Sequence, residues 1–309
     1  MAAGAAGRRR AADLVHAGAV PVLVAIGREQ ALSEAASYVA PPAPEEEDNV
    51  YDEHLLVVGT GIRTTGQLTV ETIACMQSAV RLFYIVADPV AEAVIRRFCP
   101  DGAESLYDLY GEGKPRMQTY REMVDRILTS VRAGQRTVVA FYGHPGVFAY
   151  ASHESVRRAR AEGYRARMLP GISAEDCLFA DLGIDPSANG CQSYEATDFL
   201  FNARTIDNTA QLILWQVGLI GDLTFRRYAY DTSAMPLLLE KLMLFYPPTH
   251  PVYLYEAPSV PGCEPVIRPI MLEQILASGI TATTTLYLPP ARATTPDPTY
   301  LSRARLSQG

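Results

Sequence analysis

The stretch His54-Leu-Leu-Val-Val58, followed directly by Gly59-Thr60-Gly61, decides the fold of this chain. A short apolar run that ends in a glycine-rich turn is typical of a buried strand in a parallel sheet. Residues Thr69 to Ala79 then have helical spacing, and a second apolar run follows at Leu82-Phe-Tyr-Ile-Val86. Strands that alternate with helices in this way predict an α/β domain with a mostly parallel sheet.

A third strand is expected at Thr137-Val-Val-Ala-Phe141, and the loop Tyr142-Gly-His-Pro-Gly-Val-Phe148 follows it. Two glycines and a proline at the carboxyl end of a parallel strand form a tight loop that lets a ligand approach the backbone. Beyond the segment Leu169-Pro-Gly-Ile-Ser-Ala-Glu175, the chain has fewer helical patterns and more strands. Those strands are expected at Gln211–Val217, Pro251–Glu256 and Thr283–Leu288. We therefore predict a second subdomain with a mixed sheet.

The first residues differ in composition from the rest of the chain. The apolar segment Ala19–Gly27 precedes a proline-rich acidic linker at Pro41–Asp48. We expect the apolar segment to pack on the domain or on a dimer partner, since short apolar runs usually belong to a core; the alternative is a substrate segment. The predicted divisions are an N-terminal extension and linker (1–53), two α/β subdomains (54–168 and 169–292) and a tail (293–309).

Composition excludes several classes of partner. The net charge of −7 and the absence of a long basic stripe argue against nucleic acid. No apolar run approaches the roughly 18 residues that a membrane helix requires. The cysteines show no metal-ligand spacing, so we expect no metal site and reduced thiols in a cytoplasmic protein. These residues are Cys75, Cys99, Cys177, Cys191 and Cys263.

Tyrosines and one arginine are concentrated between Leu106 and Tyr120. Arg116 and Tyr120 are four residues apart on a predicted helix, so they share a face. Tyr107 and Tyr110 precede a glycine- and proline-containing break, which lets them fold back over the helix start. A guanidinium beside phenols stabilises a developing oxyanion and assists proton transfer. The alternative is that these are half-buried surface aromatics beside a solvated charge.

A dinucleotide site is a weaker interpretation of the first glycine-rich turn. Gly59 and Gly61 match the start of a dinucleotide fingerprint, and Asp88 would be its ribose-binding acid. However, the position of the third glycine is occupied by Thr64. His144 lacks a second histidine or acid at ligand spacing, so we expect it to line a pocket or to hydrogen-bond within its loop.

Two motifs, Tyr142–Phe148 and Leu169–Pro186, occur in order with Trp215-Gln216 and the tyrosine and arginine set. In this combination the chain resembles the tetrapyrrole-methylase-fold enzymes, and among them the borosin peptide backbone α-N-methyltransferases that make omphalotin-type precursors. The resemblance extends from about Leu55 to Pro290. It implies S-adenosylmethionine as cofactor, with S-adenosylhomocysteine as product. It also implies a hydrophobic ribosomal precursor peptide as substrate and a homodimer.

The resemblance assigns roles to individual residues. Arg116 and Tyr120 match the family's catalytic arginine and tyrosine, and Tyr107 and Tyr110 match its additional active-site tyrosines. The residues that match its cofactor-binding positions are Tyr142, His144, Val147, Ser173, Ala174, Gln216, Thr284 and Thr285.

The chain also departs from the fused members of that family, which carry a helical clasp and a core peptide after the catalytic domain. Here the sequence stops at Gly309, so we expect a split type that acts on a separate peptide. Two alternatives remain open: a C-methyltransferase acting on a tetrapyrrole such as a precorrin, and a non-catalytic peptide-binding protein that retains the cofactor. The tyrosine and arginine set favours amide methylation, because a ring-carbon nucleophile does not need it.

Overall fold

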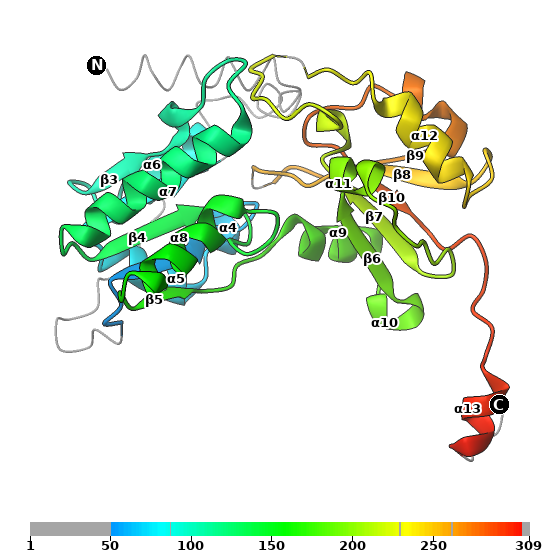
Figure 1. The fold of residues 1–309 in the computed structure, drawn as a ribbon, viewed down its shortest axis with the longest axis horizontal. Helices are drawn as coiled ribbons and strands as arrows, with labels where there is room; N and C mark the ends of the chain where they lie inside the picture. Colours follow the sequence, from blue (N-terminus) through cyan, green and yellow to red (C-terminus); the bar gives the residue numbers. More distant parts are fainter. Residues whose placement is uncertain (1–50, 87, 229, 261, 305–309) are drawn as a thin grey trace.

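The computed structural model describes residues 51–304 apart from Ala87, Ala229 and Pro261. Two five-stranded sheets organise the chain, one in each half (Figure 1). Within the described residues, no helix combines the length and apolarity needed to cross a membrane. The apolar segment Ala19–Gly27 and almost all of the predicted extension lie outside the described residues.

The first sheet is parallel throughout, as predicted from the sequence. Its strand order is β3-β2-β4-β1-β5, and every neighbouring pair is parallel. The strands are β1 (Leu55–Gly59), β2 (Arg81–Ile85), β3 (Ala103–Ser105), β4 (Thr137–Phe141) and β5 (Ala166–Met168). The helices of this half are α4 (Thr64–Gln67), α5 (Val70–Gln77), α6 (Pro89–Ile95), η2 (Tyr107–Leu109), α7 (Arg116–Arg132) and α8 (Tyr150–Ala161).

Alternate residues of β1 point into two different apolar layers. Leu56 and Val58 pack in a cluster that includes residues of α5 and α6. Leu55 and Val57 pack in a second cluster with residues of α7 and α8. Because successive side chains of a strand face opposite ways, a strand that is apolar throughout must be covered on both faces.

The second sheet is mixed, as predicted. Its order is β6-β7-β10-β8-β9, and only the β6–β7 pair is parallel. The strands are β6 (Cys191–Glu195), β7 (Gln211–Trp215), β8 (Pro251–Glu256), β9 (Val266–Met271) and β10 (Thr285–Leu288). The remaining helices are α9 (Ala174–Leu182), α10 (Pro186–Asn189), α11 (Ala196–Phe201), η3 (Val217–Leu219), α12 (Met235–Met243), η4 (Leu272–Ala277) and α13 (Pro298–Arg303).

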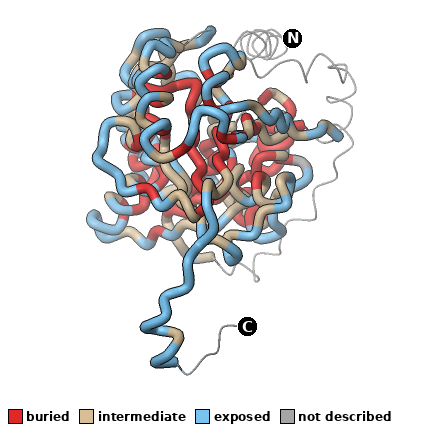
Figure 2. Tube along the Cα trace, turned by 90° about the vertical axis from the view of Figure 1, so that its right-hand side faces the viewer, coloured by how far each residue is buried: buried red, intermediate tan, exposed pale blue. Residues whose placement is uncertain are grey.

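Strand β7 also separates two layers. Leu212 and Leu214 belong to the cluster that includes buried residues of α11 and α12, whereas Ile213 and Trp215 pack with Leu178 of α9. The buried residues therefore concentrate in the interior of the molecule, and the segment leading to α13 is exposed (Figure 2).

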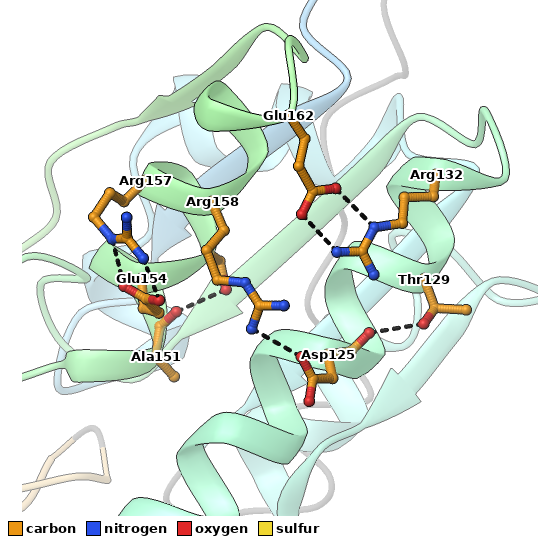
Figure 3. A network of polar contacts seen from close by, with 9 residues as sticks. Asp125, Thr129, Arg132, Ala151, Glu154, Arg157, Arg158 and Glu162 are labelled. Carbon is orange, nitrogen blue, oxygen red and sulfur yellow. Dashed lines mark hydrogen bonds and ion pairs between the residues drawn. The ribbon is translucent and has the colours of Figure 1, made fainter.

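Helix α7 carries the predicted arginine and tyrosine, and its orientation is set mainly by apolar burial. Met123, Ile127 and Leu128 are at most 1% exposed. Burying each such side chain contributes about 1.5–3 kcal/mol. Ion pairs also join α7 to the α8 region, including Arg158 with Asp125 at 2.8 Å (Figure 3). Exposed pairs of this kind contribute about 0–1 kcal/mol, so the core decides where the helix lies.

Candidate active site

Three glycines bring the predicted loop motifs together at the carboxyl ends of β1, β4 and β5. A Cβ atom on Gly171 would lie 2.9 Å from the carbonyl oxygen of Gly143 and 2.9 Å from the Cα of Gly59. Backbones approach this closely only where no side chain intervenes. The Tyr142–Phe148 loop therefore lies directly beside the segment that begins α9.

The same loop reaches the second half of the chain. The rings of Phe148 and Trp215, at the end of β7, have centroids 6.0 Å apart. Tyr142 is 38% exposed. Burial of its hydroxyl, with added repulsion from Asp88 and Cys177, raises the pKa of Tyr142, so the phenol remains a hydrogen-bond donor.

Gln216, which follows β7, and Thr284, which precedes β10, lie next to each other at the same end of the second sheet. The amide of Val217 donates to the carbonyl of Thr284 at 3.3 Å. Gln216 adopts a left-handed conformation with φ 58°, which is rare for a residue with a side chain and tends to occur at functional sites. Within the described residues its side-chain amide makes no hydrogen bond. Thr284 is buried and donates to Glu256 at 2.6 Å, and Thr285 is the buried first residue of β10.

The other predicted cofactor residues lie in the loop after β4 and at the start of α9, where some also stabilise the local fold. His144 Nδ1 accepts from the amide of Gly146 at 2.9 Å, as expected for a histidine bonded within its loop. Ser173 caps α9: its hydroxyl accepts from the Asp176 amide at 3.2 Å, and Ala174 is the first helical residue. Val147 donates its amide to the carbonyl of His144 at 3.2 Å.

The predicted tyrosines form one aromatic cluster. Tyr110 lies between Tyr107 and Tyr120, with ring centroids 5.6 Å and 6.5 Å away. Two further rings extend the cluster. Phe225 lies 4.8 Å from Tyr110, and Tyr150 stacks on Tyr120 at 6.3 Å.

Burial affects the acidity of Tyr110 within this cluster. It is the main cause of a raised pKa at Tyr110, and the neighbouring phenols of Tyr120, Tyr230 and Tyr107 add to the rise. Tyr110 therefore keeps its proton and remains a hydrogen-bond donor.

Arg116 is held at the start of α7 by the second half of the chain. Its Nη2 donates to the carbonyl of Asp222, and its backbone amide donates to the carbonyl of Leu223 at 3.0 Å. The guanidinium also faces Tyr230. Burial raises the pKa of Tyr230, and the charge of Arg116 opposes that rise. The arginine thus lies beside the half-buried phenol of Tyr230.

The model of one protein family, described as Tetrapyrrole (Corrin/Porphyrin) Methylases, matches residues 54–269. The chain belongs to this family. The match covers both sheets as far as β9 and includes every predicted site residue except Thr284 and Thr285.

Curated relatives confirm the resemblance to borosin proteins within the methylase family. The chain is 44% identical over 243 residues to the methyltransferase/ribosomally synthesized cyclic peptide dendrothelin A precursor of Dendrothele bispora, covering 76% of this chain and 57% of that protein. It is 42% identical to the corresponding omphalotin A precursor of Omphalotus olearius, with the same two coverages of 76% and 57%. A gymnopeptides precursor of Gymnopus fusipes is 42% identical, covering 82% of this chain and 61% of that protein. The chain thus spans about three fifths of the length of these relatives.

Solved structures show that the fold is shared with other tetrapyrrole methylases. A uroporphyrin-III C-methyltransferase of Thermus thermophilus matches with a TM-score of 0.55 and 17% identity, covering 82% of this chain and 97% of that one. A cobalt precorrin-4 methyltransferase matches with a TM-score of 0.55 and 15% identity, covering 77% and 95%.

The candidate site also includes residues that the sequence did not reveal. Phe225 and Tyr150 extend the aromatic cluster, whereas Asp222 and Tyr230 face Arg116. All of these except Tyr150 come from the segment after β7. The only feature of the sequence that could have indicated these residues is the high density of aromatic residues between Phe225 and Tyr230. Without the fold, nothing connected them to an arginine more than 100 residues earlier; Arg116 and Asp222 are 106 residues apart.

The dinucleotide interpretation does not fit the geometry around Asp88. The carboxylate of Asp88 accepts from the amides of Val90 and Ala91, each at 2.9 Å, and so caps α6. Burial raises the pKa of this carboxyl despite the two hydrogen bonds, so it is a poor partner for a ribose.

Proposed function

We propose that this chain is an S-adenosylmethionine-dependent methyltransferase that N-methylates backbone amides of a hydrophobic, ribosomally made peptide. The observation that carries the proposal is the Arg116 guanidinium held at the start of α7 beside half-buried tyrosines. The curated relatives, which are named as a methyltransferase combined with a cyclic peptide precursor, support it.

The residues in the loop after β4, at the start of α9 and at the adjoining ends of β7 and β10 fit such a cofactor. The side-chain amide of Gln216 has no partner among the described residues, and its strained backbone holds it at the strand end. The partly exposed rings of Tyr142 and Phe148 are suited to stacking on a purine. A related fold, the Thermus thermophilus uroporphyrin-III C-methyltransferase, was solved with S-adenosyl homocysteine. When bound, the cofactor supplies an electrophilic methyl group on a sulfonium. We infer that Tyr142, His144, Val147, Ser173, Ala174, Gln216, Thr284 and Thr285 surround it.

Amide methylation explains why an arginine and several phenols are needed. The lone pair of a peptide nitrogen is delocalised into the carbonyl, which makes the nitrogen a poor nucleophile. Arg116 carries a permanent charge that stabilises the oxygen as the amide becomes an imidate. Tyr120, on the same helix as Arg116, accepts the amide proton.

The surroundings of the cluster suit an apolar peptide. Met117 at the start of α7 is 41% exposed, Tyr150 is 41% exposed, and Leu223 is 65% exposed. Large apolar side chains left exposed around a site mark a surface that binds apolar partners. An extended peptide would place its side chains against these residues while its backbone reaches Arg116.

The proposal is tested by incubating the purified protein with S-adenosylmethionine and a synthetic peptide of the sequence Ala19–Gly27. Mass increments of one methylene on the peptide, or on the same segment within the protein, support it. Cofactor binding seen by calorimetry, together with methyl transfer to uroporphyrinogen or a precorrin but not to amides, would contradict it in favour of a tetrapyrrole C-methyltransferase. Cofactor binding without any product would favour the non-catalytic alternative.

We propose in addition that the protein is a homodimer of cytoplasmic location. Exposed apolar side chains on and near α11 and α12 (Phe201, Leu237 and Leu244) support an interface between copies. All cysteines are free thiols, which supports a reducing compartment. Sedimentation equilibrium tests the dimer, and a fluorescent fusion tests the location.

A further inference from the structure

A segment of the second half runs beside the start of α7. Pro115 forms an antiparallel bridge with Thr224. The amide of Phe225 donates to the carbonyl of Lys114 at 2.9 Å, and the amide of Gly113 donates to the carbonyl of Phe225 at 2.9 Å. The first amides of a helix have no partner within it. At α7 no side chain caps the helix, and the carbonyl of Leu223 accepts from the first helical amide, that of Arg116.

Asp222 begins this segment and makes two different kinds of contact. Its carbonyl oxygen accepts from Nη2 of Arg116. Its buried carboxylate closes the following turn: Oδ1 accepts from the amide of Thr224 at 2.9 Å and from its hydroxyl at 2.6 Å. Oδ2 lies 3.4 Å from Nε of Arg226.

The carboxylate remains ionised although it is 8% exposed. Burial acts to raise the pKa of Asp222, but hydrogen bonds from Thr224, from the backbone of Asp231 and from Arg226 outweigh it and lower the pKa. The charged or titratable groups that face it are therefore Arg116, Arg226, Tyr230 and Asp231. An ionised carboxylate with several donors is a strong local fold determinant.

We propose that Asp222 is a positioning residue that orients the guanidinium of Arg116. Its carboxylate fixes the turn, and the turn presents the Asp222 carbonyl to Nη2 while placing Phe225 against Tyr110. A free arginine side chain has about 2 kcal/mol of rotamer entropy, so a held guanidinium is oriented before the peptide oxygen becomes charged. This inference rests on the proposed function.

The first test observes Arg116 without any substrate. In nitrogen-15 arginine NMR of the full chain, we expect separate Nη signals for Arg116, because the hydrogen bond to Asp222 restricts rotation of the guanidinium. The signals are assigned by their loss in Arg116→Lys. In Asp222→Asn we expect them to merge, since the neutral amide accepts more weakly from Thr224 and loses the ionic attraction to Arg226.

Asp207→Asn is a matched control. Asp207 forms the same kind of turn: Oδ1 accepts from the Thr209 amide at 2.9 Å and from its hydroxyl at 2.7 Å. It precedes β7, whereas Gln216 and the site follow that strand. This variant should leave both the Arg116 signals and the methylation rate unchanged.

The second test measures methyl transfer to the peptide of sequence Ala19–Gly27 in single turnovers. Asp222→Asn should lower the rate about tenfold to a hundredfold, the range expected for a misplaced catalytic group, with cofactor affinity unchanged. In an Arg116→Lys background the same substitution should have no further effect, because Asp222 acts through Arg116.

The outcomes separate the inference from the function. Unchanged Arg116 signals in Asp222→Asn, or equal rate losses in both backgrounds, would overturn the positioning role. Merged signals together with no methyl transfer by the wild-type protein would overturn the proposed function and leave the positioning role supported.

Discussion

The rings of Tyr110 and Tyr120 meet edge to face with centroids 6.5 Å apart. The two phenols differ in their surroundings. Tyr110 has a raised pKa, caused mainly by burial, so it keeps its proton. Tyr120 shares α7 with Arg116. We therefore propose that Tyr120 accepts the amide proton and that Tyr110 packs against its ring.

Substitution of the two phenols should separate these roles. Tyr120→Phe removes the proposed base, so we expect the single-turnover rate to fall by about 10²–10⁴. Tyr110→Phe keeps the ring that packs against Tyr120 and removes only the hydroxyl, so we expect a smaller loss of about fivefold, equivalent to about 1 kcal/mol for one polar interaction. Tyr84→Phe, at a buried tyrosine that bonds Glu92, is the control. A larger loss in Tyr110→Phe than in Tyr120→Phe would reverse the assignment.

The contact between Phe148 and Trp215 should control cofactor affinity. It joins the loop after β4 to the end of β7, and the proposed cofactor residues lie on both sides of it. Phe148→Ala should weaken S-adenosylhomocysteine binding about tenfold, since an aromatic pair contributes about 0.5–1.5 kcal/mol beyond its buried area. Calorimetry measures the change. Phe201→Ala, at an exposed ring in α11, serves as the control, and equal affinities in all three proteins would refute this prediction.

The hydrogen bond between Thr284 and Glu256 should also affect cofactor binding. Thr284 lies beside Gln216, and its hydroxyl donates to Glu256 at 2.6 Å. Thr284→Val retains the shape but removes the donor, so the backbone that supports Gln216 loses one constraint. We expect a loss of cofactor affinity of about fivefold, equivalent to about 1 kcal/mol for one hydrogen bond. Affinity equal to that of the wild type would show that Thr284 does not support the site.

Tyr246 gives a prediction about stability and pH. Its hydroxyl is buried and has no hydrogen-bond partner within residues 51–304 as described. Burial, with a smaller effect of Asp207, raises the pKa of Tyr246 to about 12. Because the folded pKa exceeds the unfolded value of about 10, the folded state holds this proton more tightly. The contribution of this proton to the free energy of unfolding is fully present below pH 10 and is lost as the pH rises to about 12.

Tyr246→Phe should therefore reduce the loss of stability in alkali. At neutral pH it should leave the free energy of unfolding unchanged or raise it by about 1 kcal/mol, because it removes an unpaired buried hydroxyl. Tyr255→Phe is the contrast, since that hydroxyl donates to Asp181 at 2.8 Å and its removal should destabilise the protein. Urea unfolding at neutral and alkaline pH measures both. Similar losses of stability in the two variants would contradict the prediction.

The sequence predicted the buried strands well, because continuous apolar runs leave little choice of structure. Thr137–Phe141 and Pro251–Glu256 are strands with the predicted bounds. Cys191–Glu195 was missed because it is polar and only half-buried. Val266–Met271 was missed because it is an exposed edge strand that contains Pro269, and prolines are tolerated there.

The candidate site was predictable only where its residues are close in sequence. Arg116 and Tyr120 share a helical face, which their spacing predicts. The contribution of Asp222, Phe225 and Tyr230 depends on how the second half of the chain lies against α7. No local pattern encodes that contact, and the tail likewise gave no signal for α13.

The most direct measurement is tandem mass spectrometry after incubation with S-adenosylmethionine that carries a deuterated methyl group. The wild-type protein and Arg116→Lys are each incubated with the peptide of sequence Ala19–Gly27, and both the peptide and the protein are fragmented. The account predicts labelled methyl groups on backbone nitrogens, and a rate at least a hundredfold lower for Arg116→Lys, as expected when an oxyanion-stabilising group is removed (about 10²–10³). Label on carbon or side-chain atoms, or full activity in Arg116→Lys, would contradict it.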